Sequence, residues 1–334
     1  MFKSKKILSV LLCLSIVFAL GACSKESNEN NKNNNANSTD KLNVICTVFP
    51  QYDWVKNILG SRIDDVNLTL LIDSGVDLHN YQPTVDDLAE ISKCDMFVYV
   101  GGESDEWVDD ALQNASNKDM IAVNLIDALG NTVKEEEVKD GMETEEEEHN
   151  KDEEENEYDE HIWLSIKNAV TLCGTISKKI QSLDPSNADE YKNNTDTYIN
   201  ALTQLDSQYE AVCSNAETKT LLFGDRFPFR YMVDDYGLDY YAAFVGCSAE
   251  TEASFETISF LAGKADELNL HAIITIEGTD HKIAQTIISN TASKDQEILS
   301  LNSMQGVTGD DVKNNVSYLS IMTDNLTTLE KALA

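Results

Sequence analysis

Basic residues, histidine and proline are all scarce in this chain. Its 334 residues include 25 Lys and Arg against 59 Asp and Glu, a formal net charge of −34, and only 5 His and 4 Pro. A surface this acidic is repelled by phosphate backbones and anionic lipid headgroups, which argues against nucleic acid and against a basic membrane-binding patch. The same excess of carboxylates suits a protein that works near cations.

Several signatures of enzymes and of thiolate metal sites are also absent. There is no H-E-x-x-H, the motif that holds zinc beside a general base, so a secreted zinc hydrolase is not indicated. No segment resembles a phosphate-binding loop, and no two cysteines have C-x-x-C spacing. We interpret the five cysteines beyond residue 23 as small buried side chains rather than a disulfide frame or a thiolate metal site. They are Cys46, Cys94, Cys173, Cys213 and Cys247.

The longest apolar run, Ile7–Leu20, is too short to span a bilayer comfortably and follows a cluster of lysines. It ends in Leu-Gly-Ala-Cys, which resembles the lipobox of bacterial lipoproteins. We therefore expect residues 1–23 to be a lipoprotein signal peptide and Cys23 to be the lipidated start of the mature chain. The Asn- and Ser-rich residues 24–41 are typical of a flexible tether. These features predict an extracytoplasmic protein, lipid-anchored to the bacterial cell membrane.

Short apolar strands alternate with amphipathic helices, which predicts an α/β fold with mostly parallel sheets. One long helical pattern, within 186–214, interrupts the alternation. We predict two similar lobes, 42–185 and 215–334, each with a central sheet flanked by helices and joined by this linking helix. Strands are predicted at 42–48, 66–72, 95–100 and 120–124, then at 220–223, 239–244, 271–276 and 297–301, and a terminal helix at 310–334.

The predicted first lobe contains a strongly acidic segment, 134–160. Its 27 residues include 16 Asp and Glu and three Lys. Like charges at this density repel one another, so we predict an unfolded loop. His149 lies within this loop, where it would capture metal weakly; a solvated spacer without a role is the alternative.

Two histidines occupy comparable positions. His79 follows a predicted strand, and His161 lies where the acidic loop meets an apolar segment. An imidazole in such a place is either a metal ligand or a polar side chain bonded to nearby backbone. Because ligands bind beyond the carboxyl ends of parallel strands, His79, Asp225 and Asn302 should share one edge. Two imidazoles with one or two oxygens would hold Zn²⁺ or Mn²⁺.

Four segments together resemble the solute-binding lipoproteins of zinc and manganese ABC importers, and the acidic, His-containing loop before His161 resembles a feature of their zinc-specific branch. The segments are DLHNYQPT (77–84), GGESDEWVDD (101–110), DEHIWLS (159–165) and CSAETEAS (247–254). The resemblance covers almost everything after residue 41, and it implies the two-lobed fold, with His79 and His161 as metal ligands.

The chain departs from the family pattern at the other two ligand positions. Counted back from Tyr-Gly-Leu at 236–238, the third position falls on Arg226, which has no lone pair to offer. Two alternatives follow: Asp225, the nearest residue able to replace it, is the ligand, or Arg226 merely pairs with a cleft carboxylate. The fourth position falls on Asn302, a weaker oxygen donor, and Glu277 is expected to orient an imidazole.

The function that this resemblance implies is capture without catalysis. We expect a monomer that binds Zn²⁺ in the cleft between its lobes and delivers it to an ABC transporter permease. The alternatives are a manganese-binding member of the same class, a binder of haem or an iron chelate, and a surface adhesin.

Overall fold

The structure, a computed structural model, describes residues 41–143, 158–248 and 252–334. The predicted signal peptide with Cys23, nearly all of the tether, and His149 lie outside these residues. Among the described helices, none is both long enough and apolar enough to cross a bilayer. The predicted residue boundaries of the two lobes stay a prediction.

The first half of the chain forms a four-stranded parallel sheet in the order β2-β1-β3-β4. Its central strand β3 is buried along its whole length, because helices cover both faces of the sheet. The elements are β1 (Leu42–Cys46), α1 (Phe49–Leu59), β2 (Val66–Leu70), α2 (Val85–Ile91), β3 (Met96–Tyr99), α3 (Trp107–Gln113), β4 (Ile121–Asn124) and α4 (Leu125–Leu129).

The second half forms a parallel sheet of the same kind, in the order β6-β5-β7-β8. The pairing of β5 with β6 is irregular between Phe223 and Arg226, so Asp225 lies where the regular ladder is interrupted. The elements are β5 (Thr220–Phe227), α7 (Arg230–Tyr236), β6 (Asp239–Val245), α8 (Phe255–Glu267), β7 (Ala272–Ile276), α9 (Lys282–Asn290) and β8 (Glu297–Leu301). The predicted α/β class with two similar lobes is confirmed.

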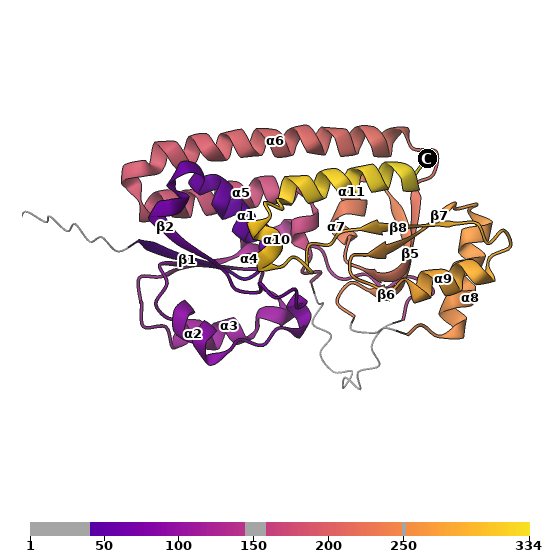
Figure 1. Ribbon diagram of the computed structural model, residues 1–334, viewed down its shortest axis with the longest axis horizontal. Coiled ribbons are helices and arrows are strands. Elements are labelled where there is room, and N and C mark those ends of the chain that lie inside the picture. Colours follow the sequence, from indigo (N-terminus) through magenta and orange to yellow (C-terminus); the bar gives the residue numbers. More distant parts are fainter. Residues whose placement is uncertain (1–40, 144–157, 249–251) are drawn as a thin grey trace, which may run out of the picture. The chain divides into compact units, whose positions relative to one another are not determined.

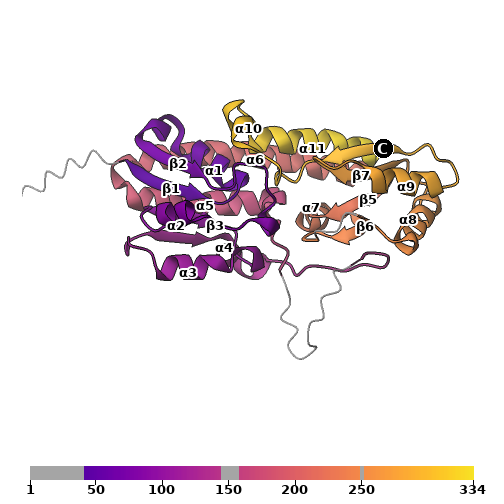
Figure 2. The same ribbon diagram turned by 60° about the horizontal axis from the view of Figure 1, so that its bottom comes forward.

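Helix α6 (Ala188–Asn215) runs beside elements of both halves (Figures 1 and 2). It buries a stripe of Tyr and Leu at helical spacing, as predicted for the linking helix. In its first half the Tyr198 hydroxyl donates to Asp53 of α1 at 3.3 Å. Further along, the Tyr209 hydroxyl donates to the Met322 carbonyl of α11 (Tyr318–Ala332) at 2.6 Å. One helix is thus attached to both halves.

Trp163 connects the two halves close to the predicted site. It lies in a short 3₁₀ turn, Ile162–Leu164, before α5 (Ile166–Leu183). Its indole N–H donates to the Ser303 carbonyl at 2.8 Å, and its own carbonyl accepts from the Tyr318 hydroxyl at 2.7 Å. All three partners are buried, so the bonds are shielded from water.

Two predictions are corrected. The terminal helix is two helices, α10 (Gly309–Lys313) and α11, because Asn315 adopts a positive φ of 63° and Ser317 caps a new helix. Part of the acidic segment is not an unfolded loop either. The Glu143 N–H donates to the Ala243 carbonyl of β6 at 2.9 Å, and Met142 packs against the core. Charge density alone did not reveal these apolar anchors.

We predict that Tyr318→Phe lowers the free energy of unfolding by about 1–2 kcal/mol, because the buried Trp163 carbonyl loses its hydrogen-bond donor. Urea unfolding followed by circular dichroism measures this change. Tyr158→Phe is the matched control, since that side chain is 50% exposed, and it should alter stability by less than about 0.5 kcal/mol. Equal effects from the two substitutions would contradict the assigned role of Tyr318.

Candidate metal centre

His79 is held in a short 3₁₀ turn, Leu78–Asn80, that follows β2. The turn begins at Asp77, whose carboxylate accepts the His79 backbone N–H at 3.1 Å. The imidazole Nδ1 lies 2.8 Å from the Ser104 hydroxyl oxygen and 3.4 Å from Glu160 Oε2. A proton on Nδ1 therefore has two oxygens near it, and the lone pair of Nε2 is left for another partner.

His161 is completely buried and is oriented by the carboxylate two residues before it. Asp159 Oδ1 accepts both the backbone N–H of His161, at 2.8 Å, and its ring Nδ1–H, at 3.0 Å. This arrangement fixes the tautomer, because the proton on Nδ1 leaves Nε2 as the free nitrogen. A carboxylate behind a histidine is the usual support of a metal-ligating imidazole.

The two free nitrogens face each other. His79 Nε2 lies 3.3 Å from His161 Nε2. A zinc ion bound at 2.0–2.1 Å from each of two imidazoles with tetrahedral angles would hold them about 3.3–3.4 Å apart. The predicted pair of histidines, separated by 82 positions in the chain, is therefore brought together at the spacing of two zinc ligands.

The electrostatics of the pair depend on whether a proton or a cation lies between the rings. Burial, and then the neighbouring His161, lowers the pKa of His79 to about 3. Burial also opposes charge on His161, but the Asp159 carboxylate outweighs it and raises the pKa of His161. A proton on His161 would lie where a metal would bind, so protons and metal compete for one position.

A third donor lies beside the histidines. Cys247 follows β6, and its Sγ belongs with His79 and His161 to a group whose ligand atoms all lie within 4.8 Å of one another. A search of the described residues for three or more His, Cys, Asp or Glu side chains at this spacing finds this group. The interpretation of the cysteines as buried holds for the other four, whereas Cys247 is partly exposed. Its place after a strand, in the segment CSAETEAS, was the available signal.

Arg226 and Asp225 have other partners. The guanidinium of Arg226 forms an ion pair with Asp77, the kind of cleft carboxylate predicted for it. The Asp225 carboxylate accepts the backbone N–H of Arg226 at 2.9 Å and that of Ile276 at 3.3 Å. The structure therefore does not bring Asp225 into the group with the histidines, and its assignment as a ligand stays a prediction.

Asn302 and Glu277 lie at the same edge of the second sheet, where they hold a loop. The Asn302 side-chain oxygen accepts the Met304 N–H at 2.7 Å. Glu277 accepts the backbone N–H of Ser303 at 2.7 Å and its hydroxyl at 2.8 Å. Glu277 thus supports the loop that receives the Trp163 indole, and these contacts involve no imidazole.

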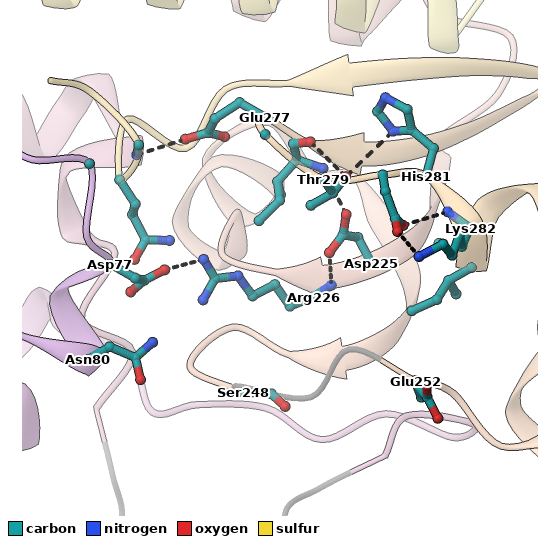
Figure 3. Close-up of a pocket in the computed structure, with 18 residues that line it drawn as sticks. Asp77, Asn80, Asp225, Arg226, Ser248, Glu252, Glu277, Thr279, His281 and Lys282 are labelled. Carbon is teal, nitrogen blue, oxygen red and sulfur yellow. Dashed lines mark hydrogen bonds and ion pairs between the residues drawn. The ribbon is translucent and has the colours of Figure 1, made fainter.

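A cleft of about 840 Å³ opens beside this group (Figure 3). Asp77 and Ser248, near neighbours in sequence of His79 and Cys247, line it, and so do Arg226 and Glu277. The histidines themselves do not line the cleft. Figure 3 shows the Arg226 side chain extending across to Asp77, between elements of the two halves. The metal-ligand group is therefore next to the cleft rather than open to it.

A buried acidic layer supports the histidines from the first half. Glu160 Oε1 accepts the Ser104 N–H at 2.9 Å, and burial raises the pKa of Glu160 to about 7. Asp105 accepts the Gly101 N–H at 2.9 Å, and burial raises its pKa to about 6. These two carboxyl groups titrate near neutral pH and can stabilise positive charge in the centre.

The fold and the site together indicate a two-lobed protein with a candidate histidine-containing metal centre. The sequence model described as "Zinc-uptake complex component A periplasmic" matches residues 44–332, and the chain belongs to this ZnuA family. The chain is 32% identical over 299 residues to the high-affinity zinc uptake system protein ZnuA of Bacillus subtilis, with 88% of each chain covered. It is 30% identical to the zinc-binding lipoprotein AdcA of Streptococcus pneumoniae, covering 98% of this chain and 61% of that protein. The chain thus spans about three fifths of the AdcA proteins it matches.

Solved structures agree with this assignment. The metal-dependent lipoprotein YcdH of Bacillus subtilis superposes with a TM-score of 0.71 at 28% identity, over 88% of this chain and 99% of that one. The Zn(II)-bound ZnuA-like domain of Streptococcus pneumoniae AdcA gives 0.68 at 26% identity, with the same coverage. The resemblance to this family that the four sequence segments indicated is confirmed.

We predict that Asp159→Asn lowers the affinity for Zn²⁺ by about 10–100-fold, because the amide no longer fixes His161 with Nε2 free. Isothermal titration calorimetry measures the affinity. Asp95→Asn is the control, since Asp95 bonds to Asn43 away from the centre, and it should leave the affinity unchanged. Unchanged zinc affinity in a folded Asp159→Asn protein would contradict the orienting role.

We also predict that metal affinity falls as the pH falls. The raised pKa of His161 means that protons begin to compete above pH 6.5, the ordinary value for histidine, whereas His79, with a pKa of about 3, contributes nothing in that range. Zinc titrations between pH 5 and pH 8 test this. Constant affinity across the range would contradict it.

Proposed function

We propose that this protein binds Zn²⁺ outside the cytoplasm and delivers it to an ABC transporter permease. The observation that carries the proposal is the 3.3 Å separation of His79 Nε2 from His161 Nε2, each with its other nitrogen directed at an oxygen. Membership of a family described as a zinc-uptake component supports it, as does a Zn(II)-bound relative of similar fold.

The charges around the centre favour zinc over manganese. Mn²⁺ prefers several oxygen ligands, whereas imidazole nitrogen suits Zn²⁺. Of the nearby carboxylates, Asp77 is paired with Arg226 and Asp159 is bonded to His161. Neither carboxylate can coordinate a cation directly without giving up its present partner.

Capture and delivery require no chemical turnover. We propose that the protein acts as a monomer without enzymatic activity and is held at the membrane through a lipid on Cys23. The lipoprotein name of the pneumococcal relative supports this anchor. The cleft lies next to the centre, so it marks the side from which a permease would receive the ion.

We predict that His79→Ala and His161→Ala each abolish high-affinity zinc binding, since a site with one imidazole loses the chelate. Equilibrium dialysis of the purified protein with Zn²⁺ and Mn²⁺ in competition measures occupancy and preference together. His271→Ala is the matched control, because that histidine bonds to the Lys331 carbonyl on the surface and should not affect binding. Tighter binding of Mn²⁺ at equal free concentration would overturn the zinc assignment.

A further inference from the structure

We propose that Cys247 is the third protein ligand of the metal and binds it through Sγ as a thiolate. The centre is then a His₂Cys site, in which the sulfur determines the preference for zinc. This inference rests on the proposed function of His79 and His161 and adds to it the donor that those two residues do not supply.

Geometry is the first argument. The Sγ of Cys247 and a ligand nitrogen of each histidine all lie within 4.8 Å of one another. In a tetrahedral site with Zn–S of 2.3 Å and Zn–N of 2.0–2.1 Å, sulfur and nitrogen are about 3.6 Å apart. The observed limit leaves on the order of 1 Å to close, which a change in the cysteine side-chain torsion can supply.

The backbone before Cys247 is built to approach His161. A Cβ on Gly246 would lie 2.9 Å from the Phe227 carbonyl oxygen and 3.2 Å from His161 Cε1. Only glycine lets the end of β6 pass so close to the imidazole. The next residue is Cys247, whose own N–H is held by Glu136 at 3.3 Å. The turn therefore fixes the backbone position from which the thiol reaches the histidines.

Arg226 explains why the donor comes from β6. The family resemblance places the third ligand at Arg226, on β5, but this guanidinium is occupied by Asp77. Strand β6 is the neighbour of β5, and Arg226 pairs with Phe244, three residues before Cys247. A donor that follows β6 thus lies at the same edge of the sheet as Arg226, one strand away from β5.

Charge is an independent argument for sulfur. Two neutral imidazoles bring no negative charge into direct contact with a divalent ion, and the nearby Asp77 and Asp159 already have partners. A thiolate supplies one negative charge in direct contact with the metal. The thiol proton is released to solvent as the S–Zn bond forms, so the exchange is balanced. Because thiolate is a soft ligand, it favours Zn²⁺ and disfavours Mn²⁺.

Cobalt(II) tests the sulfur ligand directly, because a cobalt–thiolate bond gives an intense near-ultraviolet charge-transfer absorption that nitrogen and oxygen ligands do not give. We expect the Co²⁺-loaded protein to show this band and Cys247→Ala to lose it. Cys94→Ala is the control: Cys94 precedes β3, at the sheet edge opposite the centre, and its removal should leave the band. A band that survives Cys247→Ala in a folded protein would overturn the proposal.

Metal affinities separate this inference from the function on which it rests. We expect Cys247→Ala to weaken Zn²⁺ binding by about 10–100-fold, the range typical for losing a residue that only supports a ligand. We also expect it to narrow the preference for Zn²⁺ over Mn²⁺. Cys247→Ser tests the same atom with a harder donor and should narrow the preference as well. If zinc binding depends on His79 and His161 but is unchanged in both Cys247 variants, the function stands and the ligand assignment fails. If the wild-type protein binds no zinc, the function itself fails.

Discussion

The contact of His79 Nε2 with His161 Nε2 is the constraint on which the rest of the centre depends. Two buried imidazoles at 3.3 Å cannot both be protonated, and two lone pairs facing each other repel. The structure arranges Ser104 and Glu160 behind one ring and Asp159 behind the other. Those supports leave the Nε2 atoms of both histidines directed at one point, and a cation bound to both, as proposed above, would remove the repulsion between their lone pairs.

The second half of the molecule determines which further groups lie beside the two histidines. It presents a guanidinium, the Arg226 side chain, where the family resemblance places a ligand, and a thiol one strand away. The guanidinium neutralises Asp77, whose carboxylate oxygen lies 3.9 Å from the free Nε2 of His79. The same substitution that removes a ligand from β5 therefore also removes a competing carboxylate, and both effects shift the chemistry of the centre towards nitrogen and sulfur.

The fold could be predicted from sequence almost entirely, because strands and helices alternate with clear period and short connections. The errors were local: the break at Asn315 depends on a single positive φ, and the anchoring of Glu143 on β6 depends on a tertiary contact. Within the centre, the approach of His79 to His161 could be predicted because each lies within a recognisable segment. Cys247 could not, since an apolar context suggests burial for any cysteine, and only the folded chain shows that Gly246 brings it against His161.

The link between Arg226 and Asp77 joins the halves of the protein through an ion pair of its own side chains. Together with the Trp163 indole on Ser303, it holds the cleft in an assembled form. When a cation binds to such a preorganised site, little of its binding free energy is lost in moving the lobes. In the function proposed for this protein, affinity is then set mainly by the donor atoms, and release of the ion means displacing a donor rather than moving one half far from the other.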